Sequence, residues 1–233
     1  MVKAILFDVF GTTVDWRSSI ITELEKFGDE NGLSADWSAT ADRWRAGFRD
    51  LQAKIARGER VWITMDQIHR EVLDALLLDL GATGLPEQEV AHLNNAWHRL
   101  RPWPDTVKGL TLMKRAHIIG TLSNGNLSLL VSLAKHGGLP WDCVLSTAMF
   151  GTYKPNPEVY LGAVRMLDAE PGDVMMVAAH AYDVDGAREA GLRTAYVFRP
   201  DEFGPGKGED PGDTSRFDII ASNFVELAER LSE

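Results

Sequence analysis

The chain contains 233 residues, with 34 acidic against 24 basic side chains and a formal net charge of −10 at pH 7. Its 45% hydrophobic and 25% charged residues are typical of a folded globular protein and exclude a collagen-like, coiled-coil or wholly disordered chain. The acidic surplus, with no run of Lys or Arg to offset it, argues against a nucleic acid or an anionic membrane surface as a partner.

The first predicted element is a strand at residues 4–7. It belongs to an apolar run that continues through Val9 and Phe10, is interrupted by Asp8 and ends at Gly11. A continuous apolar run of this kind is typical of a strand buried on both faces of a parallel sheet. The strand therefore delivers Asp8 to a loop at its carboxyl end.

A helical pattern replaces the strand pattern between residues 16 and 103. Apolar residues recur at intervals of three and four along four segments, and no strand is predicted among them. The recurring positions are Ile20, Ile21, Leu24 and Phe27, then Trp44, Phe48, Leu51 and Ile55, then Ile68, Val72, Leu73 and Leu76, and finally Val90, Leu93 and Trp97.

Two prolines mark the return from this helical segment. Pro102 and Pro104 flank Trp103 and indicate a hinge. Asp105 follows them and is of a residue type that caps helices, so a helix is predicted from there to about Lys114.

Strand-like runs return after residue 117, and each is followed by a helical pattern. This alternation predicts an α/β fold with a parallel sheet covered by helices on both faces. Because the first strand belongs to the same sheet, the helical segment is an insertion after it. Residues 199–216, rich in Gly and Pro, are expected to form a surface loop. The predicted strands are 118–122, 143–145, 174–179, 194–198 and 219–221.

Cysteine content and apolar runs bear on the compartment. Cys143 is the single cysteine, which leaves no disulfide framework and no cysteine-based zinc site. No apolar stretch approaches the roughly 20 residues of a membrane span, and the apolar run at the start of the chain is too short for a signal sequence. We therefore expect a cytoplasmic protein.

Polar residues that follow predicted strands are the candidates for chemistry, because ligands of open parallel sheets bind beyond the carboxyl ends of the strands. Four short motifs carry them. They are Asp-Val-Phe-Gly-Thr at 8–12, Leu-Ser-Asn-Gly at 122–125, Tyr-Lys-Pro at 153–155 and Ala-His-Ala-Tyr-Asp at 179–183.

These motifs, in this order, resemble those of the haloacid dehalogenase superfamily. The helical insertion stands where that family carries its first cap domain. The resemblance implies a Rossmann-like core formed by residues 1–14 and 101–233, with an inserted helical cap domain at residues 15–100.

Two departures within the motifs indicate the subfamily. Phe10 stands where phosphatases of the superfamily carry a second Asp, and Ala179 stands where another Asp helps to hold Mg²⁺. Loss of these carboxylates disfavours both metal binding and phosphoryl transfer. With Tyr160 six residues after Lys154, the sequence is similar to the metal-independent (S)-2-haloacid dehalogenases, which implies no metal and no other cofactor.

The resemblance implies a role for each motif in that reaction. Asp8 would be the nucleophile that displaces halide from C2 of a small 2-haloacid. Lys154 would hold the pKa of Asp8 down and attract the substrate carboxylate. Thr12 and Ser123 would position Asp8 and the substrate through hydrogen bonds, and Tyr160 would contact the nucleophile or the carboxylate side of the pocket.

The departing halide needs its own binding group, and the family supplies an Asn and a cap-domain Arg. Asn124 matches the Asn. Arg43, Arg45 and Arg49 all lie on one helical segment, and Arg45 is favoured because Trp44-Arg45 resembles the family's aromatic-Arg pair. We also expect three rings to wall the pocket, those of Phe10, Tyr160 and Tyr182.

Hydrolysis of the Asp8 ester is assigned to the fourth motif. Asp183 matches the family Asp that would orient or deprotonate the attacking water. His180 is a departure, since family members often carry Asn there, and our hypothesis is that it acts as the base or assists it. The other histidines show no metal-ligand motif; they are His69, His92, His98, His117 and His136.

The expected function is hydrolytic dehalogenation of small (S)-2-haloalkanoic acids to 2-hydroxy acids. A phosphatase or phosphonatase is the enzyme alternative, because residues 11–15 also resemble phosphonoacetaldehyde hydrolases. The non-enzyme alternative is a catalytically silent binding protein, against which the presence of Asp8, Lys154 and Asp183 together counts. The seven Trp residues are explained by core packing or by a homodimer interface.

Overall fold

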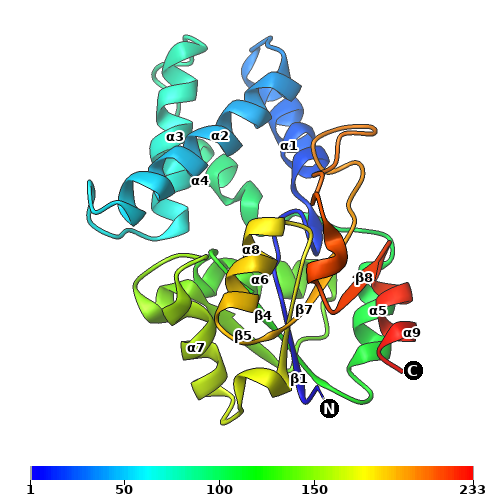
Figure 1. Ribbon diagram of the computed structural model, residues 1–233. Helices are drawn as coiled ribbons and strands as arrows, with labels where there is room; N and C mark the ends of the chain where they lie inside the picture. The colour runs from blue at the N-terminus through cyan, green and yellow to red at the C-terminus, as the bar shows by residue number, and fades with distance from the viewer. Residues whose placement is uncertain (1, 233) are drawn as a thin grey trace.

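The computed structural model describes residues 2–232, and a six-stranded parallel sheet forms its centre (Figure 1). The strand order is β5-β4-β1-β6-β7-β8. The central strand β1 pairs on one side with β4 and on the other with β6. The α/β class is confirmed, and every predicted strand lies within one residue of the observed bounds. These are β1 Ala4–Phe7, β4 Ile118–Ser123, β5 Cys143–Ser146, β6 Val174–Ala178, β7 Arg193–Val197 and β8 Ile219–Ala221.

The two faces of the sheet are covered by different helices, because alternate residues of each strand point to opposite sides. Ile5 and Phe7 pack in one apolar cluster with α5 and α9. Ala4 and Leu6 pack in another with α7 and α8. This double burial explains why the strands read as continuous apolar runs. The helix bounds are α5 Thr106–Met113, α6 Leu127–Gly137, α7 Pro157–Met166, α8 Ala181–Glu189 and α9 Phe224–Arg230.

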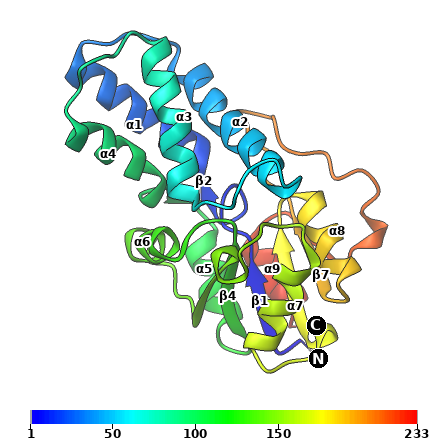
Figure 2. The same ribbon diagram turned by 90° about the vertical axis from the view of Figure 1, so that its left-hand side faces the viewer.

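The four predicted helices of the insertion form a separate group beyond the carboxyl ends of the strands (Figures 1 and 2). Side chains cap three of them, since Asp15, Asp36 and Thr64 each accept a hydrogen bond from a backbone N–H of the first turn. The helices are α1 Trp16–Asn31, α2 Trp37–Ala56, α3 Met65–Asp79 and α4 Glu87–Asn94, and short 3₁₀ helices occupy Asn95–His98, Thr147–Phe150, Pro171–Asp173 and Thr214–Arg216.

A two-stranded antiparallel ribbon joins this helical group to the sheet. It pairs β2, Val14–Asp15, with β3, Arg101–Pro102, which is a short strand in the segment where none was predicted. Just beyond it, the backbone N–H of Trp103 donates to the carbonyl of Thr13 at 3.2 Å. The chain thus leaves and rejoins the sheet at one place, which is where the sequence divides into residues 1–14, 15–100 and 101–233. That these parts are separate domains stays a prediction.

Two expectations about local structure are wrong. Asp105 stands at the start of α5 but makes no capping bond, because its carboxylate instead accepts hydrogen bonds from Arg199 and from the backbone of Phe224. The loop at 199–216 is not only a surface loop, because Arg199 and Glu202 on it are 7% and 1% exposed.

The positions of the tryptophans and the lengths of the helices bear on the expected homodimer interface and on the expected absence of a membrane span. All seven Trp residues are buried or partly buried, and Trp16, Trp44 and Trp97 belong to the core of the helical group. Core packing thus accounts for them, and they give no support to a homodimer. No helix within residues 2–232 is both long and apolar enough to cross a bilayer.

Candidate active site

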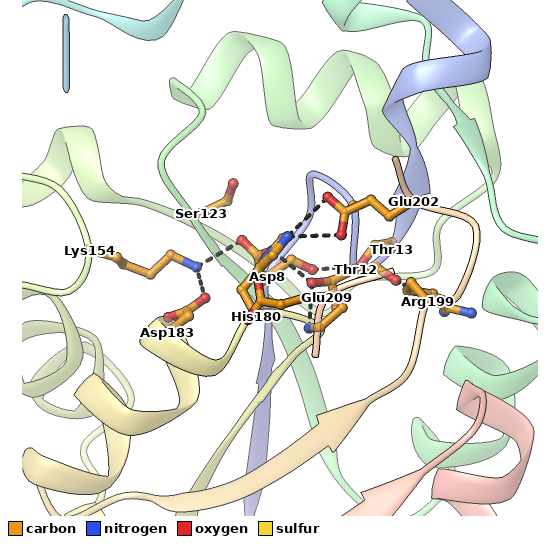
Figure 3. Close-up of polar contacts among 12 residues, drawn as sticks. Asp8, Thr12, Thr13, Ser123, Lys154, His180, Asp183, Arg199, Glu202 and Glu209 are labelled. Carbon is orange, nitrogen blue, oxygen red and sulfur yellow. Dashed lines mark hydrogen bonds and ion pairs between the residues drawn. The ribbon is translucent and has the colours of Figure 1, made fainter. Parts of the chain in front are cut away.

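Asp8 lies directly after β1 and is 5% exposed (Figure 3). A tight turn follows it, in which Gly11 has a φ of +86° and the backbone N–H of Thr13 donates to the carbonyl of Val9. The turn brings the hydroxyl of Thr12 back to Asp8 Oδ2, at 2.7 Å. The expected pairing of Thr12 with Asp8 is therefore present.

Lys154 places its ammonium group between two carboxylates. Its Nζ lies 2.8 Å from Asp8 Oδ1 and forms a second, very short ion pair with Asp183. The Lys154 side chain is fully buried, and its backbone N–H donates to the side-chain oxygen of Asn124 at 3.0 Å. Asn124 thus holds the loop that carries Lys154.

These contacts fix the charges at the site. Burial disfavours the charged form of Lys154, but the attraction of Asp183 and Asp8 outweighs it and raises the pKa of the ammonium group. Burial likewise opposes the ionisation of Asp8, but Lys154 and His180 together lower the pKa of Asp8 well below its usual range. Asp8 is therefore an ionised, almost unhydrated carboxylate, as a nucleophile should be.

Asp183 lies in the first turn of α8 and is wholly buried. One of its oxygens accepts from Lys154, and the other accepts from the hydroxyl of Tyr160 at 2.8 Å. The expectation that Tyr160 contacts the nucleophile is thus corrected: α7 packs against α8, so the hydroxyl of Tyr160 meets Asp183 instead. Burial and the charge of Asp8 raise the pKa of Asp183 despite its contact with Lys154. That Asp183 orients or deprotonates the attacking water stays a prediction.

His180 lies between Asp8 and a carboxylate that the motifs did not predict. Its Nδ1 is 3.3 Å from Asp8 Oδ2, and its Nε2 is 3.0 Å from Glu202 Oε1. Burial favours the neutral ring, but Glu202 and Asp8 raise the pKa of His180 to about 10. The charged imidazolium is therefore favoured in the resting site, and the hypothesis that His180 acts as the base for ester hydrolysis, or assists it, stays a prediction.

Glu202 is the residue that sequence reasoning missed. It lies in the loop beyond β7, is 1% exposed, and also accepts a hydrogen bond from the indole N–H of Trp16 at 3.1 Å. A Cβ at Gly11 would stand 2.1 Å from Glu202 Oε1, so Gly11 is required for this close approach as well as for its φ. The available signal was position alone, since Glu202 follows a strand at its carboxyl end.

Ser123 does not take its expected place. It is fully buried, and its Oγ accepts a hydrogen bond from the backbone N–H of Gly125 at 3.3 Å. Figure 3 shows it apart from the hydrogen-bonded groups around Asp8. Burial at the end of β4 turns its hydroxyl to the local turn, so the structure does not bring it to Asp8.

A cavity lies over Asp8, and α2 forms its roof. Its volume is about 20 Å³. A single water needs at least about 10–15 Å³ by that measure, so the free space suits one or two small groups. The lining residues are Asp8, Phe10, Arg45, Phe48, Arg49, Gln52, Asn124, His180 and Tyr182.

Of the three candidate arginines, Arg45 is the one buried at the cavity. It is 8% exposed, with its guanidinium 4.9 Å from the ring centre of Phe48, and 5.3 and 5.9 Å from those of Trp16 and Phe10. Arg43 is exposed and paired with Asp79, and Arg49 is exposed at the rim.

Two of the three expected pocket rings line the cavity, those of Phe10 and Tyr182, whereas Tyr160 does not. Phe10 is buried in its wall, whereas Tyr182 is 43% exposed at its mouth, with its ring 5.9 Å from that of His180. Within the described part of the chain, no three His, Cys, Asp or Glu side chains are grouped so that they could hold a metal ion.

Comparison with known proteins gives concordant matches. The family model of haloacid dehalogenase-like hydrolases matches residues 2–191. An (S)-2-haloacid dehalogenase of Xanthobacter autotrophicus is 31% identical over 207 residues, which cover 85% of this chain and 76% of the relative.

Two solved structures are similar over the whole chain. One, described as a defluorinating L-2-haloacid dehalogenase, has a TM-score of 0.96 and 43% identity, covering 100% of this chain and 96% of its own. The other, described as an L-2-haloacid dehalogenase, has a TM-score of 0.94 and 44% identity, covering 100% and 99%.

Proposed function

Since this chain belongs to the haloacid dehalogenase-like hydrolases, and within them to the (S)-2-haloacid dehalogenases, we propose that it hydrolyses small (S)-2-haloalkanoic acids to 2-hydroxy acids. The observation that carries the proposal is the Asp8 carboxylate. It is buried and ionised, it is paired with Lys154 at 2.8 Å, and it faces a cavity with about 20 Å³ of free space. An anionic nucleophile in a small, nearly dry chamber suits displacement at a carbon that bears few substituents.

The first half-reaction forms an ester. One Asp8 oxygen attacks C2 from the side opposite the halogen, the carbon–halogen bond breaks with both electrons leaving on the halide, and C2 is inverted. Lys154 offsets the negative charge of Asp8 and of the substrate. The halide leaves toward Arg45 and Asn124, which both line the cavity.

The second half-reaction hydrolyses that ester, and we assign its base to His180. Ester formation removes the charge of Asp8, so Glu202 becomes the one anionic contact of the ring and the pKa of His180 falls. The imidazolium then releases a proton to solvent. The neutral ring donates from Nε2 to Glu202, which leaves the Nδ1 lone pair facing the ester.

Water then cleaves the Asp8 ester with His180 as the base. Nδ1 of His180 takes a proton from water as the hydroxide oxygen adds to the Asp8 ester carbonyl. The intermediate collapses, the carbonyl carbon releases the product oxygen, and the new Asp8 carboxyl group passes its proton to that oxygen. A 2-hydroxy acid leaves, and ionised Asp8 and the imidazolium of His180 are restored. The net products are the hydroxy acid, halide and one proton.

The proposal is tested with (S)-2-chloropropionate in the presence of EDTA. We expect chloride and the (R)-2-hydroxy acid in equal amounts, and no chloride from the (R) substrate. Fluoroacetate should be included, because one of the similar structures is described as defluorinating. Turnover only of a phosphate ester with Mg²⁺ would establish the phosphatase alternative, and turnover of no substrate would favour the silent binding protein.

His180→Asn is predicted to stall the reaction at the ester. Chloride should appear as a burst of about one equivalent, after which steady-state turnover should be about 10²- to 10⁴-fold slower than in the unmodified enzyme, as for loss of a general base. Rapid-quench chloride measurement and the intact mass of the quenched protein report the ester.

Glu209→Gln is the matched control for the His180 variant. Glu209 lies on the same loop as Glu202, but its carboxylate accepts from the backbone of Ala181 rather than from His180. We expect no burst and nearly full turnover from it. Unchanged steady-state turnover of His180→Asn would remove His180 from the mechanism and return the base role to Asp183.

We also propose a cytoplasmic location, supported by the single cysteine. Cys143 is partly buried, and burial raises the pKa of its thiol, which suits an inert rather than a redox-active group. The homodimer stays a prediction. The net charge of −10 continues to argue against a nucleic-acid partner.

A further inference from the structure

Two buried donors on the roof of the cavity lack a hydrogen-bond partner among the residues described. They are Nε of Arg45 and Nε2 of Gln52. A buried donor left unpaired costs roughly 1–3 kcal/mol, so such groups call for an explanation, and an absent ligand is one. Both residues line the cavity over Asp8.

The helix α2 sets the relative positions of these two donors. Gln52 follows Arg45 by seven residues, which is about two turns, so both side chains lie on one face and about 10 Å apart along the helix axis. Phe48 and Arg49 lie between them on the same face and also line the cavity. Arg45, enclosed by rings, forms the deep end of this roof, and Gln52 forms the outer end.

Gln52 stands at the junction of two cavities. A second, larger cavity of about 450 Å³ adjoins the one over Asp8. We call the residues that line both cavities the neck; they are Arg49, Gln52, Asn124 and Tyr182. A substrate that enters from the outer cavity must pass Gln52 before it reaches Asp8.

The charge of this passage is opposite to that of the whole chain. Asp8 is the one carboxylate among the residues that line the two cavities, whereas five cationic side chains line them, namely Arg45, Arg49, Arg57, Lys154 and His180. The chain as a whole carries −10. Local positive potential in a cleft raises the concentration of anions there, whatever the net charge.

The groups expected to bind the substrate carboxylate leave room for a further donor. Lys154 gives two of its three N–H donors to Asp8 and Asp183, and Ser123 lines neither cavity, whereas a carboxylate has about four acceptor sites. If the halide lies at Arg45, the carboxylate needs a donor elsewhere along the roof. The side-chain amide of Gln52 has a free N–H donor, Nε2, and the positive charge of Arg49 lies beside it in the neck.

We therefore propose that Gln52 Nε2 donates a hydrogen bond to the carboxylate of the bound 2-haloacid at the neck, and that Gln52 thereby sets the affinity for the acid. This inference rests on the proposed function, because it takes the substrate to be a small carboxylic acid. It assigns Gln52 to substrate binding, with no part in bond formation. Interactions present equally in the ground state and the transition state change KM and leave kcat nearly unaltered.

The test compares Gln52→Met and Gln52→Glu, which keep the length of the side chain. Loss of a hydrogen bond to a charged acceptor raises KM for (S)-2-chloropropionate by about 10- to 100-fold in Gln52→Met. Gln52→Glu, which adds like-charge repulsion, should raise KM further. In both variants kcat should stay within about threefold.

Two additions guard against a merely structural effect. The inhibition constant of propionate, which has the carboxylate but no halogen, should rise in parallel with KM. Gln88, exposed on α4 and remote from the site, supplies the control variants Gln88→Met and Gln88→Glu, which should leave KM and kcat unchanged. If Gln52→Glu does not fold, Gln52→Met alone carries the comparison.

The outcomes separate this inference from the proposed function. An unchanged KM in the Gln52 variants, or a fall in kcat at constant KM, overturns the role of Gln52. Absence of chloride release from the unmodified enzyme overturns the proposed function instead.

Discussion

Asp8→Ala is expected to abolish chloride release from (S)-2-chloropropionate, with kcat lowered by about 10⁴-fold or more, as for loss of a covalent nucleophile. Among residues 2–232, no other carboxylate lines the cavity. Asp183 cannot replace Asp8, because it lies behind Lys154 with a hydrogen bond on each oxygen. Chloride release and the intact mass of the protein after incubation with substrate measure the effect, and we expect neither turnover nor an ester.

The fold should survive this change, because each cation keeps an anionic partner. Lys154 retains Asp183, and His180 retains Glu202. The control is Asp173→Ala, an Asp whose ion pair with Lys3 lies at the surface and far from the site, and it should retain full activity. Chloride release by Asp8→Ala at a substantial fraction of the normal rate would mean that Asp8 is not the nucleophile.

Lys154→Met is expected to damage both stability and activity. It leaves Asp8 and Asp183 buried without the cation that they share, and breaking a buried pair in this way costs about 3–5 kcal/mol of unfolding free energy. Activity should fall by about 10³-fold. The Asp8 carboxylate and the substrate carboxylate then meet without a cation between them, and burial without Lys154 disfavours the ionised form of Asp8. Urea unfolding and chloride release measure the two effects.

The stability deficit of Lys154→Met has an expected pH dependence. In the unmodified enzyme the lowered pKa of Asp8 contributes stability that is present above the unfolded pKa of about 4 and is lost below it. In the variant, burial without Lys154 raises the pKa of Asp8, so the deficit is full at neutral pH. It should shrink as the pH falls and the carboxylates take up protons.

Lys114→Met supplies the matched control for Lys154→Met. Lys114 also pairs with an aspartate, Asp142, but both side chains are more than a third exposed, so we expect a loss of at most about 1 kcal/mol and normal activity. Equal losses of stability in the two variants would contradict the importance assigned to the buried pair.

The fold followed from sequence because each core strand carries its own signal. β1 and β6 are buried along their whole length, so their apolar runs stand out from the helical segments between them. The site residues of the four motifs follow strands or stand close together in sequence, and the topology of the sheet then brings them together. Asp8, Lys154 and His180 are examples. Local pattern and global fold agree at these positions, which is why they could be predicted.

The remaining parts of the site depend on contacts that no local pattern encodes. Glu202 belongs to the Gly-rich loop at 199–216 and contacts His180. The position of its carboxylate depends on Gly11 and Trp16, which are distant in sequence. The spacing of Tyr160 from Lys154 predicts a contact with the nucleophile or with the carboxylate side of the pocket, but helix packing directs the Tyr160 hydroxyl to Asp183. The charge state of His180 depends on both carboxylates and so required the assembled site.

The short ribbon of β2 and β3 has a consequence for how such enzymes change over evolution. Both crossings between the sheet and the helical group lie in this one ribbon, so the helices can vary without separating any two neighbouring strands of the sheet. Asp8 and Lys154 belong to one side of that boundary, whereas Arg45 and Gln52 belong to the other. The nucleophile and its cation are thus encoded apart from the roof of the pocket, and substitutions in α2 offer a route to new substrates that leaves the nucleophile in place.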